Sequence, residues 1–144
     1  MRLRIALVAV AVLSLAPLAA PAQVRLGVGG DYIFNEQGVF ELTLAVEGRL
    51  ARHIAAFGRF GALLTTSSAS AGVPLDFGLR VTPGGRTYFE ALIGPWFFFN
   101  GGDAVRGHAA FGFGLEQRHF SFGLEVGALT GANAMLGARL AWRI

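Results

Sequence analysis

Three polar residues in the last third of the sequence have the side-chain types needed for serine-dependent ester hydrolysis. His119, Ser121 and Glu125 are separated by even intervals, so an extended strand places all three on one face. In such a site the histidine takes the serine proton and the carboxylate orients the histidine. Strand spacing alone does not bring a nucleophile and its base within hydrogen-bond reach, and Arg139 is a better partner for Glu125. We therefore expect polar interior residues here and predict no catalytic residue.

Metal and phosphate chemistry are not indicated either. His53, His108 and His119 are scattered, and no cluster of His, Asp and Glu has the spacing of metal ligands. The glycine-rich run 27–30 (GVGG) is not followed by a helix, so it does not resemble a phosphate-binding loop. Its expected role is to leave room inside a crowded interior. We predict no metal-binding residue, no cofactor-binding residue and no cofactor.

The first 22 residues have the three zones of a secretory signal peptide. Arg2 and Arg4 precede an apolar run over 5–15, and Ala20-Pro21-Ala22 forms a small-residue cleavage site. The apolar run is too short for a spanning helix, although a retained anchor helix is the alternative. The sequence thus predicts a signal peptide over 1–22, one domain over 23–144, and export from the cytoplasm.

Charge and cysteine content exclude several classes of protein. All 12 basic residues are arginine, and removal of Arg2 and Arg4 leaves ten arginines against nine acidic residues, a net charge of +1. No basic cluster is present to follow a phosphate backbone, so nucleic acid is not an expected partner. The chain has no cysteine, so an exported domain of this size must be stabilised by something other than disulfides.

From Val24 onward, apolar and polar residues alternate with a period of two, which predicts strands. Turn-forming residues separate segments of about ten residues, the length of a strand that crosses a bilayer at a tilt. No later stretch has the roughly 20 consecutive apolar residues of a membrane-spanning helix. The eight predicted strands cover 24–34, 38–49, 53–64, 73–82, 87–99, 107–117, 119–129 and 134–144.

The two faces of these strands differ in size and charge. One face carries large apolar side chains, such as Phe111, Phe113 and Phe122, whereas the other carries charged residues spaced by glycine, alanine and threonine. The interior of an eight-stranded barrel is barely wide enough for side chains to fill it, so the large apolar groups must point outward. In water they would form an apolar band far larger than soluble monomers expose, so we expect them to face lipid. The charged residues predicted to point inward are Arg25, Asp31, Glu41, Glu47, Arg49, Arg59, Asp76, Arg80, Glu90, Glu116, Glu125, Arg139 and Arg143.

Trial hairpin registers bring opposite charges together on this inner face, because cross-strand partners share a face. Each register is defined by one pair of opposed residues. Val126 opposite Ala138 pairs Glu125 with Arg139, and Leu79 opposite Ala91 pairs Arg80 with Glu90. Leu44 opposite Ala56 pairs Glu41 with Arg59 and Glu47 with His53, and a weaker choice sets Arg59 beside Asp76. Such pairing allows a narrow interior to hold ions that would be costly alone.

One end of the interior is predicted to be apolar instead. Its side chains either line a small pocket for hydrophobic molecules or form a stopper that fills the barrel. These inward-pointing residues are Ile33, Val39, Leu63, Trp96, Phe98, Leu129 and Met135.

Over residues 23–144 the chain resembles the small eight-stranded outer-membrane β-barrels of Gram-negative bacteria, the outer-membrane protein A-like group in the broad sense. The most specific feature is the last strand, 136–144, which has apolar residues at every second position and Trp142 third from the end. It is similar to the C-terminal signal read by the barrel-assembly machinery, although the family usually ends in phenylalanine and this chain in Ile144. The resemblance implies an all-β, up-and-down antiparallel transmembrane barrel with both termini in the periplasm. Loops 35–37, 65–72, 100–106 and 130–133 would then lie outside the cell.

The resemblance implies a cell-envelope protein of the outer membrane, porin-like in architecture, with outer-membrane lipids and the assembly machinery as partners. A packed lumen favours a structural or surface-interaction role over a general pore. One alternative is binding or passage of a small hydrophobic ligand. Another is lipid-acting catalysis, since lipid A deacylases are eight-stranded barrels that use residues of these types. In this chain the corresponding candidates are His119, Ser121 and Glu125. A soluble, lipocalin-like barrel would require the opposite facing of the two residue sets.

Overall fold

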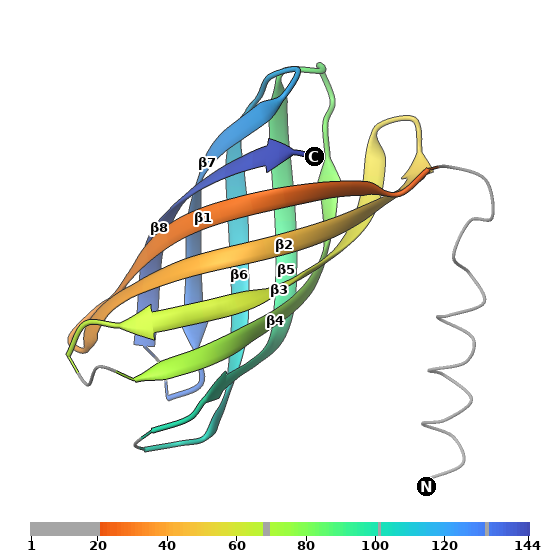
Figure 1. The fold of residues 1–144 in the computed structure, drawn as a ribbon. Helices are drawn as coiled ribbons and strands as arrows, with labels where there is room; N and C mark the ends of the chain where they lie inside the picture. The colour runs from red at the N-terminus through yellow and green to blue at the C-terminus, as the bar shows by residue number, and fades with distance from the viewer. Residues whose placement is uncertain (1–20, 68–69, 101, 132) are drawn as a thin grey trace, which may run out of the picture.

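The structure is a computed structural model that describes residues 21–67, 70–100, 102–131 and 133–144. Most of the predicted signal peptide, residues 1–20, lies outside the described residues. Each strand pairs antiparallel with the next, and β8 pairs with β1 to close a barrel (Figure 1). The strands are β1 (Gln23–Ile33), β2 (Gln37–Ala51), β3 (Ile54–Thr65), β4 (Ala71–Val81), β5 (Thr87–Phe98), β6 (Val105–Glu116), β7 (Phe120–Leu129) and β8 (Asn133–Arg143).

This architecture confirms the predicted all-β, eight-stranded, up-and-down antiparallel barrel. The predicted strand ends differ from the observed ones by no more than two residues. In the described parts of the chain, no helix is long and apolar enough to span a membrane. The start of β1, the end of β8 and the β2–β3, β4–β5 and β6–β7 hairpins all lie at one end of the barrel, which we call the terminal end (Figure 1).

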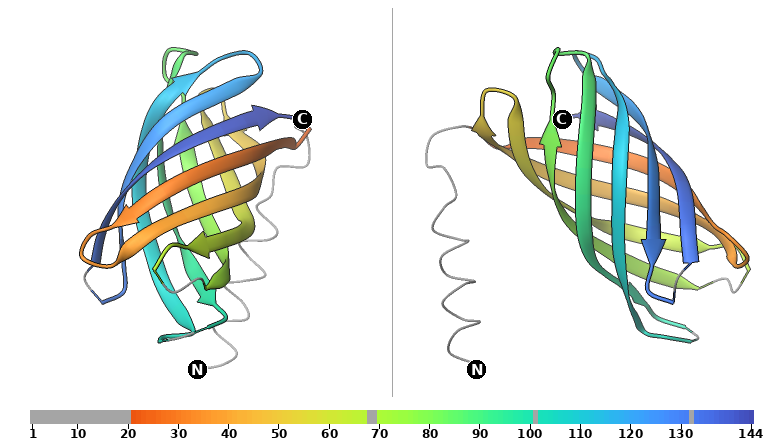
Figure 2. Two further views of the ribbon diagram at one scale, coloured as in Figure 1. Left: turned by 60° about the vertical axis from the view of Figure 1, so that its left-hand side comes forward. Right: turned by 180° about the vertical axis from the view of Figure 1, so that it is seen from behind.

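Closure is complete along the seam between the first and last strands. The β1–β8 ladder runs from Arg25 opposite Arg143 to Ile33 opposite Met135. The views from two further sides show tilted strands around the whole circumference (Figure 2). Because closure pairs both edge strands, no long row of unpaired backbone groups remains at a sheet edge.

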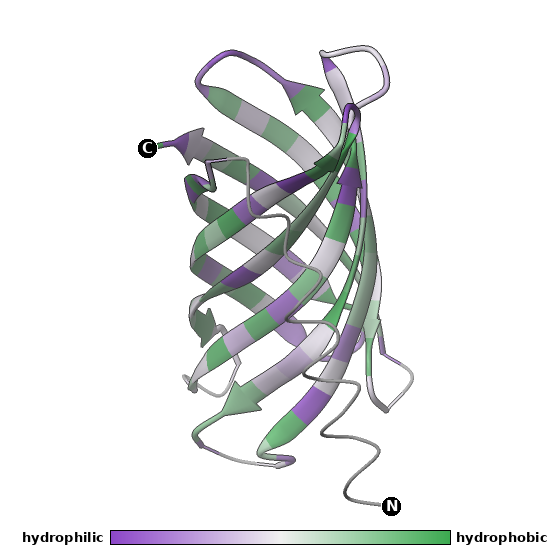
Figure 3. Ribbon diagram, turned by 90° about the vertical axis from the view of Figure 1, so that its right-hand side faces the viewer, coloured by the Kyte–Doolittle hydropathy of each residue, from purple (hydrophilic) through white to green (hydrophobic). Residues whose placement is uncertain are grey.

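Side chains alternate between the two faces as the sequence predicts. In β7, Phe120, Phe122 and Leu124 are exposed outside, whereas Ser121 and Glu125 are buried inside. The same alternation gives the bands of green and purple along the strands in Figure 3. The polarity of the barrel is therefore inverted, with large apolar groups outside and charged groups inside.

Glycines on the inner face make room for the charged side chains. A Cβ atom at Gly29 would collide with the guanidinium of Arg139, which lies across this position. At Gly27, a Cβ would lie 2.8 Å from Oγ1 of Thr43. Gly27 and Gly29 thus have the space-making role predicted for the run, whereas Val28 and Gly30 lie on the outer face.

Two of the four trial registers are confirmed and two are wrong. Leu79 lies opposite Ala91, with Arg80 opposite Glu90, and Arg59 lies opposite Asp76. The β7–β8 register is shifted by two residues, so that Val126 pairs with Leu136 rather than Ala138.

The β2–β3 register is shifted by four residues. Leu44 pairs with Phe60 rather than Ala56, which places Glu41 opposite Leu63 and Arg59 opposite Ala45. Glu41 and Arg59 are therefore not cross-strand partners, and neither are Glu47 and His53. The physical reason is that alternation fixes which face a residue occupies but not the register in steps of two.

Candidate functional site

The interior holds two groups of ion pairs, the first of which lies toward the terminal end. This terminal layer consists of Arg25, Glu47, Arg80, Glu90 and Glu116. Arg25 contacts Glu116 at 2.6 Å and Glu47 at 3.2 Å. Arg80 donates to Glu90 at 2.9 Å from Nη2, and its guanidinium carbon lies 4.3 Å from the centre of the Tyr88 ring. Both buried guanidiniums thus have carboxylate partners.

The second group, the central layer, is built around two buried arginines. Arg59 donates to Asp76 from Nη2 and to Glu125 from Nη1, both at 2.9 Å. Asp76 is completely buried, so water cannot solvate its carboxylate. The guanidinium of Arg59 stabilises the negative charge instead. This arginine joins β3, β4 and β7 across the lumen.

Arg139 has the same role on the other side of the central layer. Its Nη2 atom lies 2.8 Å from Asp31, 3.2 Å from Glu41 and 3.3 Å from Glu125. The predicted pair between Glu125 and Arg139 therefore exists, as a diagonal contact. Glu41, expected beside Arg59, lies against Arg139 instead.

His108 also belongs to the central layer. This position of His108 was not predicted from the sequence. Its Nδ1 atom lies 2.8 Å from Oδ1 of Asp76, and its Nε2 atom lies 3.8 Å from Glu125. The indole of Trp96 donates to the same Asp76 oxygen at 3.2 Å. The signal was present, since the outward Phe111 and Phe113 fix the parity of β6 and direct residue 108 inward.

The apolar end of the lumen is a packed plug. Its seven residues are 0–8% exposed and form one cluster, with the Trp96 ring 4.4 Å from the imidazole of His108. The arrangement confirms that these residues point inward together. Their near-complete burial favours a stopper over an open pocket. The plug consists of Ile33, Val39, Leu63, Trp96, Phe98, Leu129 and Met135.

The residues considered for ester hydrolysis do not assemble into a catalytic unit. His119 is exposed before the start of β7, while Ser121 is 2% exposed and Glu125 is held by Arg59 and Arg139. No hydrogen bond links any two of these three described residues. Across the described residues, no group of three or more His, Cys, Asp and Glu side chains is arranged to hold a metal ion.

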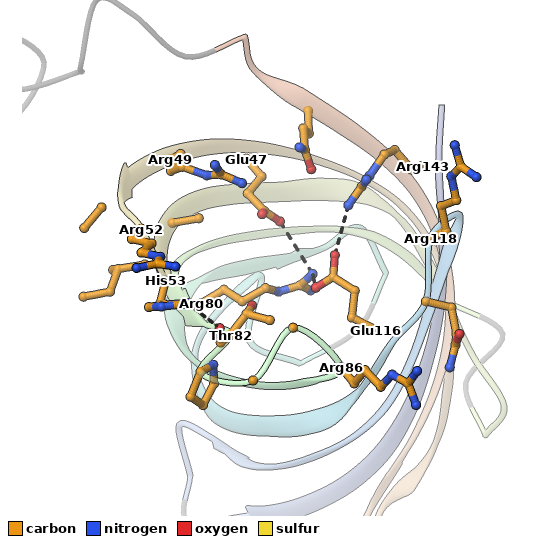
Figure 4. A pocket seen from close by; sticks show the side chains of 18 of the residues that line it. Glu47, Arg49, Arg52, His53, Arg80, Thr82, Arg86, Glu116, Arg118 and Arg143 are labelled. Atoms are coloured by element: carbon orange, nitrogen blue, oxygen red, sulfur yellow. Dashed lines mark hydrogen bonds and ion pairs between the residues drawn. The ribbon is translucent and has the colours of Figure 1, made fainter.

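Two residues predicted to face inward lie at the exposed mouth instead. Arg49 and Arg143 are exposed near the strand ends, where the barrel opens into a cavity of about 800 Å³ at the terminal end (Figure 4). Arg143 still contacts Glu116, at 3.0 Å. The inner face therefore ends in a basic, water-accessible mouth.

A closed eight-stranded barrel with apolar side chains outside and paired charges inside defines a class: the chain has the fold of the small eight-stranded outer-membrane β-barrels. Comparison of the sequence with known protein families finds no match, and comparison with curated proteins finds none either.

Solved structures provide the specific likenesses. The structure of the outer membrane enzyme PagL aligns with a TM-score of 0.61 at 14% identity, over 83% of this chain and 98% of that one. The N-terminal β-barrel domain of Pseudomonas aeruginosa OprF gives 0.59 at 12% identity, over 85% and 97%. A structure from the de novo design of transmembrane β-barrels gives 0.65 at 9% identity, over 88% and 98%. At these identities the likeness shows the fold alone.

Proposed function

We propose that the chain is an integral outer-membrane protein of the cell envelope, exported through the signal peptide over 1–22, with a structural or surface-interaction role. Outer-membrane lipids surround its apolar face, and the barrel-assembly machinery recognises its last strand, β8. The terminal end faces the periplasm, and the plug lies toward the cell exterior. Solved outer-membrane barrels of the same fold support this location.

The observation that carries the proposal is the inverted polarity. Large apolar side chains such as Phe40, Leu64 and Ile93 are 59–66% exposed on the outer wall. This exposure is unfavourable in water and favourable in contact with lipid. The interior, in contrast, holds the charged residues in ion pairs. A soluble, lipocalin-like barrel would have these two faces exchanged.

The filled lumen argues against a general pore. The plug residues are almost fully buried at one end, and the central layer bridges the lumen through Arg59 and Arg139. An eight-stranded barrel has an interior just wide enough for such side chains. The same packing disfavours passage of a hydrophobic ligand along the axis.

The proposed orientation can be tested with single cysteines, since the chain has none of its own. Asp103 is exposed in the β5–β6 loop, and Gly84 is exposed in the β4–β5 turn at the opposite end. A membrane-impermeant maleimide applied to intact cells is expected to label Asp103→Cys and to leave Gly84→Cys unlabelled until the outer membrane is permeabilised. Labelling of Gly84→Cys alone on intact cells would show the reverse orientation.

Lipid-acting catalysis is the second candidate, because PagL, a fold neighbour, is an outer-membrane enzyme. The exposed position of His119, outside the buried interior that holds Ser121 and Glu125, disfavours it. We expect His119→Ala to leave the acyl-chain pattern of lipid A, read by mass spectrometry, the same as in cells with the unaltered protein. Loss of a deacylated species in the variant would revive the enzymatic role.

A further inference from the structure

The cavity at the terminal end is surrounded by arginines from different parts of the barrel. Arg52 lies in the β2–β3 turn, Arg86 precedes β5, and Arg118 lies in the β6–β7 turn, so each hairpin at this end contributes one. Arg49 near the end of β2 and Arg143 at the end of β8 add two more. Figure 4 shows these side chains spaced around the mouth.

Four of these five arginines have no acidic partner among the described residues. Arg143 contacts Glu116, but Arg49, Arg52, Arg86 and Arg118 form no ion pair. The carboxylates that line the cavity, Glu47 and Glu116, already contact Arg25 and Arg80 below the mouth. The rim therefore carries positive charge that the barrel does not itself neutralise.

The opposite end of the barrel differs. Its arginine in the β5–β6 region, Arg106, donates to Glu36 at 2.9 Å and to the carbonyl of Thr130 at 3.1 Å. That guanidinium is fully engaged in holding loops together. Unpaired arginines thus gather at the terminal end, around a cavity whose volume of about 800 Å³ lies within the range of small-molecule sites.

The chemistry of the rim selects the kind of ligand. Guanidinium groups present planar forks of donors that match phosphate oxygens, often in bidentate pairs. A protein partner usually needs a buried aromatic or aliphatic anchor, whereas arginines, glycines and prolines make up much of this rim. A small ligand with several negative charges matches the positive charge that these arginines bring to the mouth.

We propose that the arginine rim of the terminal end is a binding site for a phosphate-bearing anion with more than one negative charge. The phosphates come either from a soluble compound or from the headgroups of an anionic phospholipid next to the rim. The binding itself is independent of the orientation proposed above; the orientation decides only that the ligand is encountered in the periplasm.

The test uses the purified, refolded chain in an uncharged detergent, with inorganic tripolyphosphate as the probe and calorimetric titration as the readout. Saturable binding of one probe per chain is expected, and higher ionic strength should weaken it. The triple variant Arg52→Gln, Arg86→Gln, Arg118→Gln should bind roughly tenfold more weakly, because it loses three of the five rim charges and each exposed charge contact contributes little by itself. Arg106→Gln is the matched control and should bind like the unaltered chain.

Competition identifies the source of the phosphate. Displacement of tripolyphosphate by micelles doped with phosphatidylglycerol, but not with phosphatidylcholine, would assign the site to lipid headgroups. Persistence of tripolyphosphate binding in both would assign it to a soluble anion. Absence of saturable binding, an unchanged affinity in the triple variant, or tighter binding of citrate than of tripolyphosphate would overturn the proposal. Heat-modifiable migration on a gel confirms that the barrel is folded in the unaltered chain and in each variant.

Discussion

Replacing Arg59 with methionine is expected to lower the free energy of unfolding by about 3–5 kcal/mol, the usual effect of removing one partner from a buried ion pair. Arg59 donates to Asp76 and Glu125 at 2.9 Å each, and all three side chains are buried. Without the guanidinium, two carboxylates remain in the lumen with fewer compensating charges. Urea titration of the refolded protein in phosphatidylcholine vesicles, followed by tryptophan fluorescence, measures the change.

Two further variants separate loss of charge balance from loss of packing. Adding Asp76→Asn and Glu125→Gln to Arg59→Met removes the two carboxylate charges that lost their partner, so part of the lost stability should return. Arg106→Met removes an arginine whose partner, Glu36, lies at the barrel end, and it should change the stability by less than about 1 kcal/mol. A single Arg59→Met variant as stable as the unaltered chain, or a triple variant no better than the single, would contradict the proposed role of the central layer.

The second large effect is expected on the outer wall. Ile93 lies near the middle of β5 with its side chain 66% exposed. If the wall faces acyl chains, Ile93→Arg places an ion near the bilayer midplane and should cost roughly 2–4 kcal/mol. If the wall faced water, the same change would shift stability by no more than about 0.5 kcal/mol. The vesicle-based urea titration again provides the measurement.

Leu50→Arg is the matched control for this substitution. Leu50 is also an exposed apolar residue, but it lies next to the β2–β3 turn at the terminal end. Near the interface an arginine should cost only about 0–1 kcal/mol. Equal effects at positions 50 and 93 would mean that depth in a bilayer does not govern the outer wall.

The strands and their faces could be predicted from the sequence because both depend on a period of two. Phe111 and Phe113 face outward, and Arg59 and Glu125 inward, as the alternation requires. The seven plug residues followed from the same parity. Register could not be derived in this way, because a slip of two residues keeps every side chain on its face, and both wrong registers are slips by an even number.

Charge pairing was an unreliable guide to register, because it gave two correct hairpins and two wrong ones. In the β4–β5 hairpin, pairing Arg80 with Glu90 gave the correct register. In the β2–β3 hairpin, pairing Glu41 with Arg59 gave the wrong answer, because Glu41 reaches Arg139 across the lumen instead. Contacts through the interior of a closed barrel join strands that are distant in sequence, so no two-strand argument includes them.

The contact of His108 within the central layer and the grouping of the rim arginines could not be derived from the sequence, for related reasons. His108 was considered only as a metal ligand, and its contact with Asp76 depends on how β4 and β6 face each other across the lumen. Arg52, Arg86 and Arg118 stand in separate turns, and only the closure of the barrel brings them around one mouth.

The central claim is that the outer wall of the barrel meets lipid, and the two tryptophans test it directly. Trp142 is 40% exposed on the outer face of β8, whereas Trp96 is completely buried in the plug. In vesicles that contain brominated phosphatidylcholine, the Trp96→Phe variant, which retains Trp142, should lose most of its tryptophan emission. The Trp142→Phe variant, which retains Trp96, should lose much less. Equal quenching of the two variants, or quenching of Trp142 by aqueous iodide but not by brominated lipid, would contradict the account.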